Sequence, residues 1–356
     1  MYREHTIGVI VPAYNEEGFI GDVIRGMPEF VDWIYTIDDC STDGTWDEIQ
    51  AAARDDAPVE AEMSSKVEEA EAIATDGGAL SMLEQRAQVH NTKGRVVPIQ
   101  HRENLGAGGA IKTGYLATLR DEIDVTVTVD GDGQMDLSQM TKLLDPIVEG
   151  EADYAKGNRL LYRNYRMSMP KWRFFGNSIL TFLTKIASGY WKTMDPQNGY
   201  TAINYRALDN AGVEEMYEYY GYCNDLLVKL NAKGMRVADV AMPAIYGDEE
   251  SSINYPEYIR KVSGMLLQNF LWRLKTRYLV LDFHPLALFY YFGAAMVGLG
   301  IIGGGWSAYV GLFGTESFFV RSSLSLMIFT MGSMFLMFAM LFDMQANESR
   351  EVQIHE

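Results

Sequence analysis

Short apolar runs alternate with helical patterns over the first 130 residues of the chain. Each run has four or more residues and is rich in β-branched side chains, which is typical of a strand covered on both faces. The predicted strands are Thr6–Pro12, Trp33–Ile37, Val96–Ile99 and Val125–Val129. Apolar residues at helical spacing predict helices over Phe19–Met27, Thr45–Arg54 and Gly109–Leu119. This alternation predicts an α/β fold with a mainly parallel central sheet, in which ligands bind beyond the carboxyl ends of the strands.

The last quarter of the chain has a different pattern, because it contains two long runs without charged residues. Residues 285–315 carry no formal charge, and a second uncharged run covers 322–342. Each is long enough to cross a hydrocarbon layer, which takes about 20 apolar residues as a helix. Two buried core helices are the alternative, but uncharged runs of this length seldom pack inside soluble domains. The short link 316–321 therefore predicts a transmembrane hairpin with both flanks on one side.

Basic residues before the first span predict which side that is. They are Arg260, Lys261, Arg273, Lys275 and Arg277. Cytoplasmic flanks are enriched in Lys and Arg, so we expect a multi-pass protein of the cell membrane with its large N-terminal part in the cytoplasm. The first strand starts at residue 6, and we expect no signal peptide before it.

These patterns divide the chain into four parts. We expect an N-terminal domain over 1–254 with an exposed acidic insertion at 55–92, an amphipathic interfacial connection over 255–283, two transmembrane helices over 284–343, and a cytoplasmic tail over 344–356. The connection mixes apolar residues with Arg and Lys, which is typical of a helix lying at lipid headgroups.

Composition excludes several classes of protein. The 356 residues include 48 acids against 30 bases, and a net charge of −18 repels a phosphate backbone, so we expect no nucleic-acid partner. Two cysteines cannot build a disulfide framework or a cysteine-based zinc site. A surface rich in acids and poor in Lys suggests a salt-loving host, and an ordinary acidic protein is the alternative.

The strongest chemical signal is the sequence Asp130-Gly-Asp132-Gly-Gln134 directly after a predicted strand. Two carboxylates separated by one residue can converge on one hard cation, and Gln134 can add a carbonyl oxygen. Oxygen ligands suit Mg²⁺ or Mn²⁺, which neutralises a diphosphate group. The alternative is a surface Asp-Gly turn, but its place in the α/β series favours the metal.

Two further motifs lie at predicted strand ends. Asp38 and Asp39 could accept hydrogen bonds from a nucleotide base or ribose, whereas helix capping explains Asp43. The glycine-rich segment 104–114 resembles a phosphate loop, but Ile111 stands where glycine is required. ATPase and dehydrogenase functions are therefore disfavoured, and the alternative is a glycine-rich helix start that lets a ligand approach the backbone.

Acids and bases also gather in the second half of the domain. Asp195 and Asp225 contribute acids, and a basic cluster precedes the apolar stretch 174–187. The cluster consists of Arg159, Arg163, Arg166, Lys171 and Arg173. It opposes the sign of the whole chain, which favours an anionic amphiphile as ligand over a merely solvated face.

Six motifs occur in the order expected of family-2 inverting glycosyltransferases. They are Pro12-Ala-Tyr14-Asn15-Glu16, Asp38-Asp39-Cys-Ser41-Thr-Asp43-Gly-Thr, Asn104-Leu-Gly106-Ala-Gly-Gly-Ala, Asp130-Gly-Asp132-Gly-Gln134, Gly157-Asn-Arg159 and Asp195-Pro-Gln-Asn-Gly199-Tyr200. The chain most resembles the polyprenyl-phosphate branch, the dolichyl-phosphate mannose or glucose synthases, over residues 6–255. The resemblance implies a GT-A nucleotide-sugar-binding fold. The insertion departs from the family pattern, and Cys40 stands where glycine is usual.

The resemblance also implies roles for individual residues. The nucleotide sugar would be bound by Pro12, Tyr14, Glu16, Asp38, Asp39 and Asp130. The divalent metal, Mg²⁺ or Mn²⁺, would be held by Asp130, Asp132 and Gln134. Arg159 and Arg173 would receive the acceptor phosphate. The catalytic set would be Asp132, Asp195 near the transferred sugar, and Asp225 near the place of a base in other members.

The function we expect is metal-dependent inverting transfer of a hexose from a UDP- or GDP-linked donor to a polyprenyl (dolichyl) phosphate at the cytoplasmic membrane face. In a halophilic archaeon the product would supply protein N-glycosylation or surface glycans. A non-processive glycosyltransferase that adds a sugar to a lipid-linked glycan is one alternative, and an inactive nucleotide-binding membrane scaffold is another. Neither span contains an ionisable residue to mark a transport pathway. The sugar, the nucleotide, the lipid length and the existence of a homo-oligomer stay open.

Overall fold

The computed structural model describes most of the chain. The described residues are 1–57, 77–160, 171–242, 255–313 and 318–354, and the side chains of 77–80, 171–175, 255–257 and 318 lie outside that description.

A nine-stranded sheet forms the centre of the described structure, in the order β3-β4-β2-β1-β5-β7-β6-β8-β9. The strands are β1 (Ile7–Ala13), β2 (Trp33–Asp38), β3 (Ala87–Val89), β4 (Val96–His101), β5 (Val125–Thr128), β6 (Tyr154–Asn158), β7 (Thr201–Asn204), β8 (Val237–Ala241) and β9 (Glu351–Ile354). Strand β7 runs antiparallel to β5 and β6, and β3 runs antiparallel to β4, whereas the other pairings are parallel. The sheet confirms the predicted α/β fold with a mainly parallel centre.

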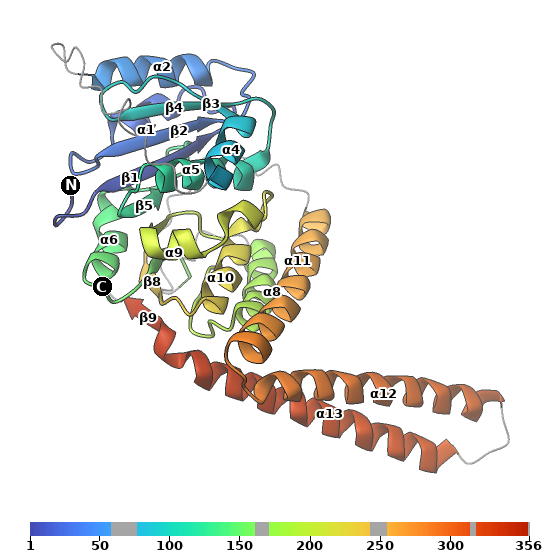
Figure 1. Cartoon of the computed structure of the whole chain (residues 1–356). Helices are drawn as coiled ribbons and strands as arrows, with labels where there is room; N and C mark the ends of the chain where they lie inside the picture. The colour runs from blue at the N-terminus through green and yellow to red at the C-terminus, as the bar shows by residue number, and fades with distance from the viewer. Residues whose placement is uncertain (58–76, 161–170, 243–254, 314–317, 355–356) are drawn as a thin grey trace.

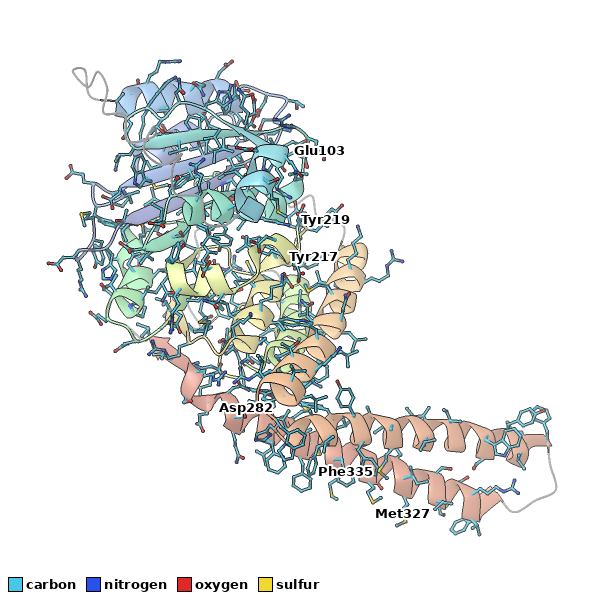
Figure 2. The ribbon with its side chains drawn as sticks, in the orientation of Figure 1. Glu103, Tyr217, Tyr219, Asp282, Met327 and Phe335 are labelled. Atoms are coloured by element: carbon cyan, nitrogen blue, oxygen red, sulfur yellow. The ribbon has the colours of Figure 1, made fainter. Side chains whose placement is uncertain are left out.

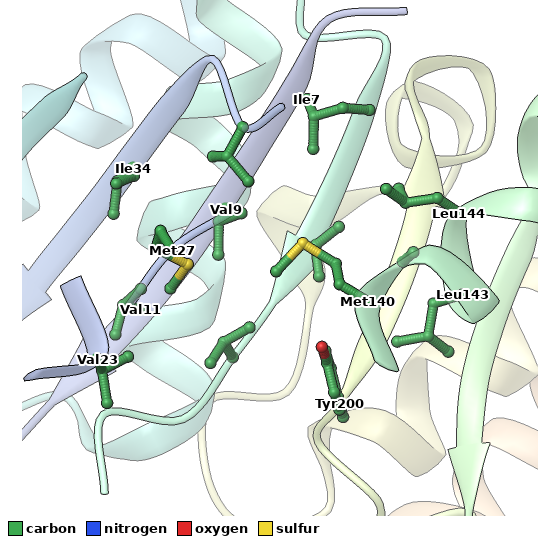
Figure 3. Packing of buried hydrophobic residues seen from close by; sticks show 14 of the residues in the cluster. Ile7, Val9, Val11, Val23, Met27, Ile34, Met140, Leu143, Leu144 and Tyr200 are labelled. Atoms are coloured by element: carbon green, nitrogen blue, oxygen red, sulfur yellow. The ribbon is translucent and has the colours of Figure 1, made fainter. Parts of the chain in front are cut away.

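Helices cover both faces of this sheet (Figure 1). They are α1 (Ile20–Arg25), α2 (Thr45–Asp56), α4 (Gly77–Arg86), α5 (Gly106–Arg120), η1 (Leu137–Gln139), α6 (Met140–Val148), α8 (Lys171–Ser188), α9 (Tyr205–Asn210), η2 (Val213–Glu215) and α10 (Tyr222–Ala232). Side chains of β1 alternate between two cores, because successive residues of a strand point to opposite faces. Val9 and Val11 join the core with α1, α2 and α6 (Figure 3), whereas Ile10 joins the core with α5.

The strand register brings the predicted motifs to one edge of the sheet. Ala13 pairs with Asp38 in β2, and Ile10 pairs with Thr128 in β5. The loops that follow these parallel strands therefore begin side by side, as the sequence analysis expected.

The predicted insertion at 55–92 is described only at its two ends, because residues 58–76 lie outside the described residues. Helix α2 extends into its start, and α4 and β3 form its end. Strand β3 pairs with β4 and was not predicted, since three residues are too short for a readable pattern.

Two long apolar helices follow the sheet domain and lie side by side (Figure 1). Helix α11 (Tyr255–Lys275) and the π-helical segment η3 (Thr276–Leu281) lead into α12 (Leu286–Phe313) and α13 (Phe318–Asn347). Gly300 allows close packing, since a Cβ there would lie 2.7 Å from the backbone of Phe329. Side chains such as Met327 on α13 point outward (Figure 2).

Both helices are long and apolar enough to cross a membrane. In their most apolar windows only 33% of α12 and 17% of α13 is buried. A core helix of a soluble protein would be mostly buried, so the pattern disfavours that alternative.

The end of the chain returns to the sheet. After α13 and η4 (Glu348–Arg350), strand β9 pairs in parallel with β8. The carboxylate of Glu351 accepts hydrogen bonds from the backbone N–H groups of Trp191, Lys192 and Thr193 at 2.7–2.9 Å. The segment expected as a tail over 344–356 therefore contributes an edge strand to the sheet.

Two of the five bases used to orient the hairpin are engaged inside the protein. Arg273 forms a double hydrogen-bonded ion pair with Asp343 at 2.7 and 3.0 Å, and both side chains are 0% exposed. Arg277 is also buried and donates to the side chain of Asn231 at 3.0 Å. Because they hold the helices to the sheet domain, they do not form a basic surface, and Arg260, Lys261 and Lys275 remain as the exposed bases.

Candidate active site

Hydrogen bonds join the loops after β1 and β2 at the carboxyl edge of the sheet. Asn15 has a left-handed φ of +58°, and its side-chain oxygen accepts from the N–H of Thr42 at 2.8 Å. The N–H of Glu16 donates to Thr45 Oγ1 at 2.7 Å. Tyr14 remains 48% exposed at this edge, beside the partly exposed Pro12. Tyr14 is therefore open to solvent at this edge.

Asp38 is buried and braces its own loop. It is 1% exposed and accepts hydrogen bonds from the N–H of Ser41 at 3.0 Å and from Gln100 Nε2 at 3.1 Å. Cys40 has a φ of +60°, a conformation that glycine adopts readily, which explains why glycine is usual there in the family.

Asp39 anchors the start of helix α5. Its carboxylate accepts from the N–H groups of Leu105 and Gly106 at 2.7 and 2.8 Å, and it bonds His101 Nδ1 at 2.6 Å. His101 Nε2 in turn bonds Thr113 Oγ1 at 2.7 Å. His101 was missed by the sequence analysis, although its place at the end of the apolar run of β4 was a usable signal.

The glycine-rich start of α5 packs closely against the backbone of a neighbouring loop. The N–H of Gly109 donates to the carbonyl of Glu218 at 2.9 Å, and a Cβ at Gly108 would lie 2.6 Å from the same backbone. Lys112 is 4% exposed and bonds the Glu218 carboxylate at 2.8 Å. The segment is thus a contact surface for a neighbouring loop, in agreement with its failure to match a phosphate loop.

The acidic pair follows β5 at the same edge. Asp132 accepts from the N–H of Gln134 at 2.9 Å, which closes a tight turn. Burial, and then the negative charge of Asp132, raise the pKa of Asp130 to about 7, against the opposing effect of Arg159. Gly199 leaves room beside this carboxylate, since a Cβ there would lie 3.3 Å from Asp130 Oδ2.

This donor set fits a hard divalent cation. Two carboxylates whose mutual repulsion raises a pKa gain from a positive charge between them. Within the described residues no group of three or more His, Cys, Asp or Glu side chains could hold a metal ion. A cation here would therefore take its remaining oxygen ligands from a substrate, from water or from Gln134, as Mg²⁺ commonly does.

Arg159 and Asp195 form one unit. Arg159 Nε and one terminal nitrogen donate to the Asp195 carboxylate at 2.7 and 3.0 Å, and the Arg159 N–H donates at 3.1 Å. Asp195 is 1% exposed. Burial opposes its ionisation, but the Arg159 charge and hydrogen bonds hold the pKa of Asp195 below its ordinary value. Arg159, which was expected at the acceptor phosphate, is thus hydrogen-bonded to Asp195, which was expected near the sugar.

The remaining predicted residues are placed less directly. Arg173 belongs to the first turn of α8, but its side chain is outside the described residues, as are Arg163 and Arg166. Asp225 is 3% exposed and accepts from the N–H of Tyr217 at 2.9 Å and from Asn269 Nδ2 at 2.6 Å. These contacts join α10 to α11, and Figure 2 shows Tyr217 in the loop beside α11. The use of Asp225 as a base stays a prediction.

Comparisons with known proteins agree with this arrangement. The sequence model described as glycosyl transferase family 2 matches residues 8–62 and 59–212, more than half of the chain. A UDP-N-acetylglucosamine–dolichyl-phosphate N-acetylglucosaminyltransferase of Methanococcus voltae is 27% identical over 244 residues, 68% of this chain and 87% of the relative. An uncharacterized protein of Methanocaldococcus jannaschii is 26% identical over 251 residues, 70% of this chain and 86% of that protein.

Among solved structures, the glucosyl-3-phosphoglycerate synthase of Mycobacterium tuberculosis, crystallised with Mn²⁺, UDP and glucosyl-3-phosphoglycerate, aligns with a TM-score of 0.46. It is 19% identical and the alignment covers 76% of this chain and 80% of that chain. From the extent of the family match, together with the central sheet and its acidic edge, the chain belongs to glycosyl transferase family 2 and is a nucleotide-sugar glycosyltransferase with a GT-A α/β fold.

Proposed function

We propose that this protein transfers a hexose from a UDP- or GDP-linked donor to a polyprenyl (dolichyl) phosphate at the cytoplasmic face of the cell membrane, with inversion of the anomeric carbon. The observation that carries the proposal is that buried contacts hold the sheet domain to the apolar hairpin, since Arg273 bonds both Asp343 of α13 and the carbonyl of Ile186 in α8. A catalytic domain fastened in this way works beside a bilayer. The name of the Methanococcus voltae relative, which specifies dolichyl phosphate, supports the same acceptor class.

The donor would lie across the carboxyl edge of the sheet. Tyr14 and Glu16, with Pro12 beneath them, and the loop of Asp38 and Asp39 would line the nucleotide pocket. Asp130 and Asp132, with Gln134, would hold Mg²⁺ or Mn²⁺, which when bound neutralises the diphosphate of the leaving group. In that arrangement Asp132 would act by holding the cation that offsets the departing charge, and Asp195 would lie beside the sugar.

The acceptor chemistry explains why no general base is needed. A phosphate monoester is already anionic near neutral pH, so its oxygen attacks the anomeric carbon without losing a proton first. Orientation of that phosphate is then the main task, which Arg159 and Arg173 would perform by charge-assisted hydrogen bonds. The bonded oxygens of Asp225 suit a reaction that does not call on it as a base.

Helix α11 carries the features expected of a contact with the membrane surface. Residues 258–275 contain no acid, although the chain carries a net charge of −18. Leu267 is 61% exposed, and its helix also exposes Leu271, Trp272 and the bases Arg260, Lys261 and Lys275. Such a face suits the headgroup region of a membrane, where Lys and Arg meet lipid phosphates. It would place the 1–254 domain over its lipid substrate, on the cytoplasmic side.

The test compares acceptors in vesicles that contain the full-length protein. Polyprenyl phosphate, the matching polyprenol and a preformed lipid-linked glycan are offered with labelled UDP- and GDP-sugars and Mg²⁺ or Mn²⁺ at high salt. We expect transfer to polyprenyl phosphate alone, with the product anomer inverted by NMR. Transfer only to the preformed glycan would replace the proposal with the lipid-linked glycan alternative. Tight nucleotide binding without any transfer would favour an inactive scaffold.

The product would be a membrane-held activated sugar. A second glycosyltransferase must consume it, for protein N-glycosylation or surface glycans.

A further inference from the structure

Asp239 on β8 is a buried hub between the two segments that carry Arg159 and Asp195. The side chain is 2% exposed, and its Oδ1 accepts from Lys156 Nζ at 2.7 Å. Its Oδ2 accepts from the side-chain amide of Asn158 and from the N–H of Met194 at 3.2 Å. Asn158 directly precedes Arg159, and Met194 directly precedes Asp195. The Asp239 carboxylate therefore holds the chain at the residue before Arg159 and at the residue before Asp195.

Lys156 secures the backbone of Asp195 itself. It lies opposite Asp239 in the parallel ladder of β6 and β8 and is 1% exposed. Its ammonium donates to the carbonyl of Met194 and to the carbonyl of Asp195, the latter at 3.2 Å. Asp195 has a φ of +49°, a left-handed conformation that residues other than glycine adopt only when their surroundings impose it.

We propose that Asp239 and Lys156 are positioning residues for the Arg159–Asp195 unit, and that they set where the guanidinium meets the acceptor phosphate. The inference rests on the proposed function for the identity of the acceptor, although the positioning itself does not. The two side chains are almost fully buried, at 2% and 1% exposed. They act through the backbone of Asp195, whose carboxylate in turn holds Arg159 on three hydrogen bonds.

A purely structural role would give a different pattern of effects. Buried ion pairs can often be replaced by apolar residues of similar size without loss of stability. If Lys156 and Asp239 only filled the core, such a replacement would restore both the stability and the kinetics of the protein. If they position Asp195, stability returns but the geometry does not, because an apolar pair cannot bind Met194 N–H and the two carbonyls.

The experiment uses the full-length protein in vesicles and three variants. Asp239→Asn removes the charge at the hub, and the double variant Lys156→Met/Asp239→Leu removes the pair. The matched control is Asp56→Asn, because Asp56 also accepts several hydrogen bonds from a base, Arg95, at 2.7–3.1 Å, far along the chain from the site. Hydrogen exchange is followed over residues 154–160 and 190–200, with steady-state kinetics for donor and acceptor.

For Asp239→Asn we expect faster exchange in both segments and a KM for polyprenyl phosphate raised about tenfold, while the donor KM stays within about twofold. The double variant should regain thermal stability but keep the raised acceptor KM. Asp56→Asn should change stability alone.

Unchanged exchange in Asp239→Asn would overturn the positioning role, whatever the acceptor proves to be. A double variant with normal acceptor KM would overturn it as well. If the wild-type protein transfers nothing to polyprenyl phosphate, the proposed function fails, and the exchange data still decide the positioning.

Discussion

The carboxyl edge of the sheet and the junction with the hairpin use buried charge in opposite ways. At the edge Asp130 lies next to Asp132, and burial with that second carboxylate raises the pKa of Asp130 to about 7. At the junction Arg273 and Asp343 are both 0% exposed and form an ion pair at 2.7 Å. At the edge Arg159 offsets the acidic charge only in part, as expected of a ligand site, whereas at the junction the two charges are paired one to one, as expected of a joint.

Substitutions in the two regions should therefore have different effects on the protein. Removal of a charge at the edge should cost activity and leave the fold intact. Removal of one charge at the junction should cost stability and leave nucleotide binding intact.

Asp132→Asn should reduce the rate of sugar transfer by about 10³-fold or more, because it weakens binding of the cation that offsets the negative charge of the leaving diphosphate. The apparent unfolding temperature should stay near the wild-type value. The measurement is transfer rate against Mg²⁺ and Mn²⁺ concentration. Asp136→Asn is the control. Asp136 lies four residues after Asp132 in the same loop, and its side chain caps η1 by accepting a hydrogen bond from the N–H of Ser138. Equal rates in wild type and Asp132→Asn, with the same metal dependence, would refute the metal role of the edge.

Arg273→Met should lower the free energy of unfolding by about 3–5 kcal/mol, because it leaves Asp343 charged and buried. The double variant Arg273→Met/Asp343→Leu should recover most of that loss. Both are checked by thermal unfolding of the full-length protein in detergent, with UDP and GDP binding as the second readout. A single variant as stable as the wild type would contradict the assignment of the junction as a joint.

The raised pKa of Asp130 predicts a pH dependence. Metal binding needs the ionised carboxylate, so Mn²⁺ affinity should fall by up to about tenfold per unit as pH drops below about 7. The folded pKa lies above the ordinary value, so the metal-free protein should lose stability as pH rises from about 4 to about 7.

Asp130→Asn should flatten that slope and abolish the change in affinity. Titration of Mn²⁺ by electron paramagnetic resonance and unfolding curves at several pH values test both parts. An unchanged slope in Asp130→Asn would assign the pH dependence to another group.

Glu351→Gln should have the smallest effect, a loss of about 1 kcal/mol, because an amide has one acceptor oxygen for the N–H groups of Trp191, Lys192 and Thr193. Hydrogen exchange at these three amides should increase while nucleotide binding stays unchanged. Unaltered exchange would mean that β9 is held by its ladder with β8 alone.

The edge could be predicted from sequence because its signals are local. The strand before the acidic pair, Val125–Thr128, consists of β-branched residues alone, and Asp130 follows two residues later. The predicted strand Trp33–Ile37 differs from the observed β2, Trp33–Asp38, by one residue.

The junction could not be predicted, because its partners are distant. Arg273 and Asp343 are 70 residues apart, and in sequence Arg273 resembles any base beside a span. Strand β9 has four residues and exists only through its pairing with β8. Asp239 was missed for the same reason, since its role depends on contacts across the sheet.

The most direct test of the account is a transfer assay on vesicles that hold the full-length protein and polyprenyl phosphate. A panel of radiolabelled UDP- and GDP-sugars is supplied with Mg²⁺ or Mn²⁺ at high salt, with and without chelator, for wild type and Asp132→Asn. The account predicts that label from one donor enters the organic phase, and that chelation or the substitution prevents this. Label that enters equally well with chelator present, or no label from any donor, would contradict it.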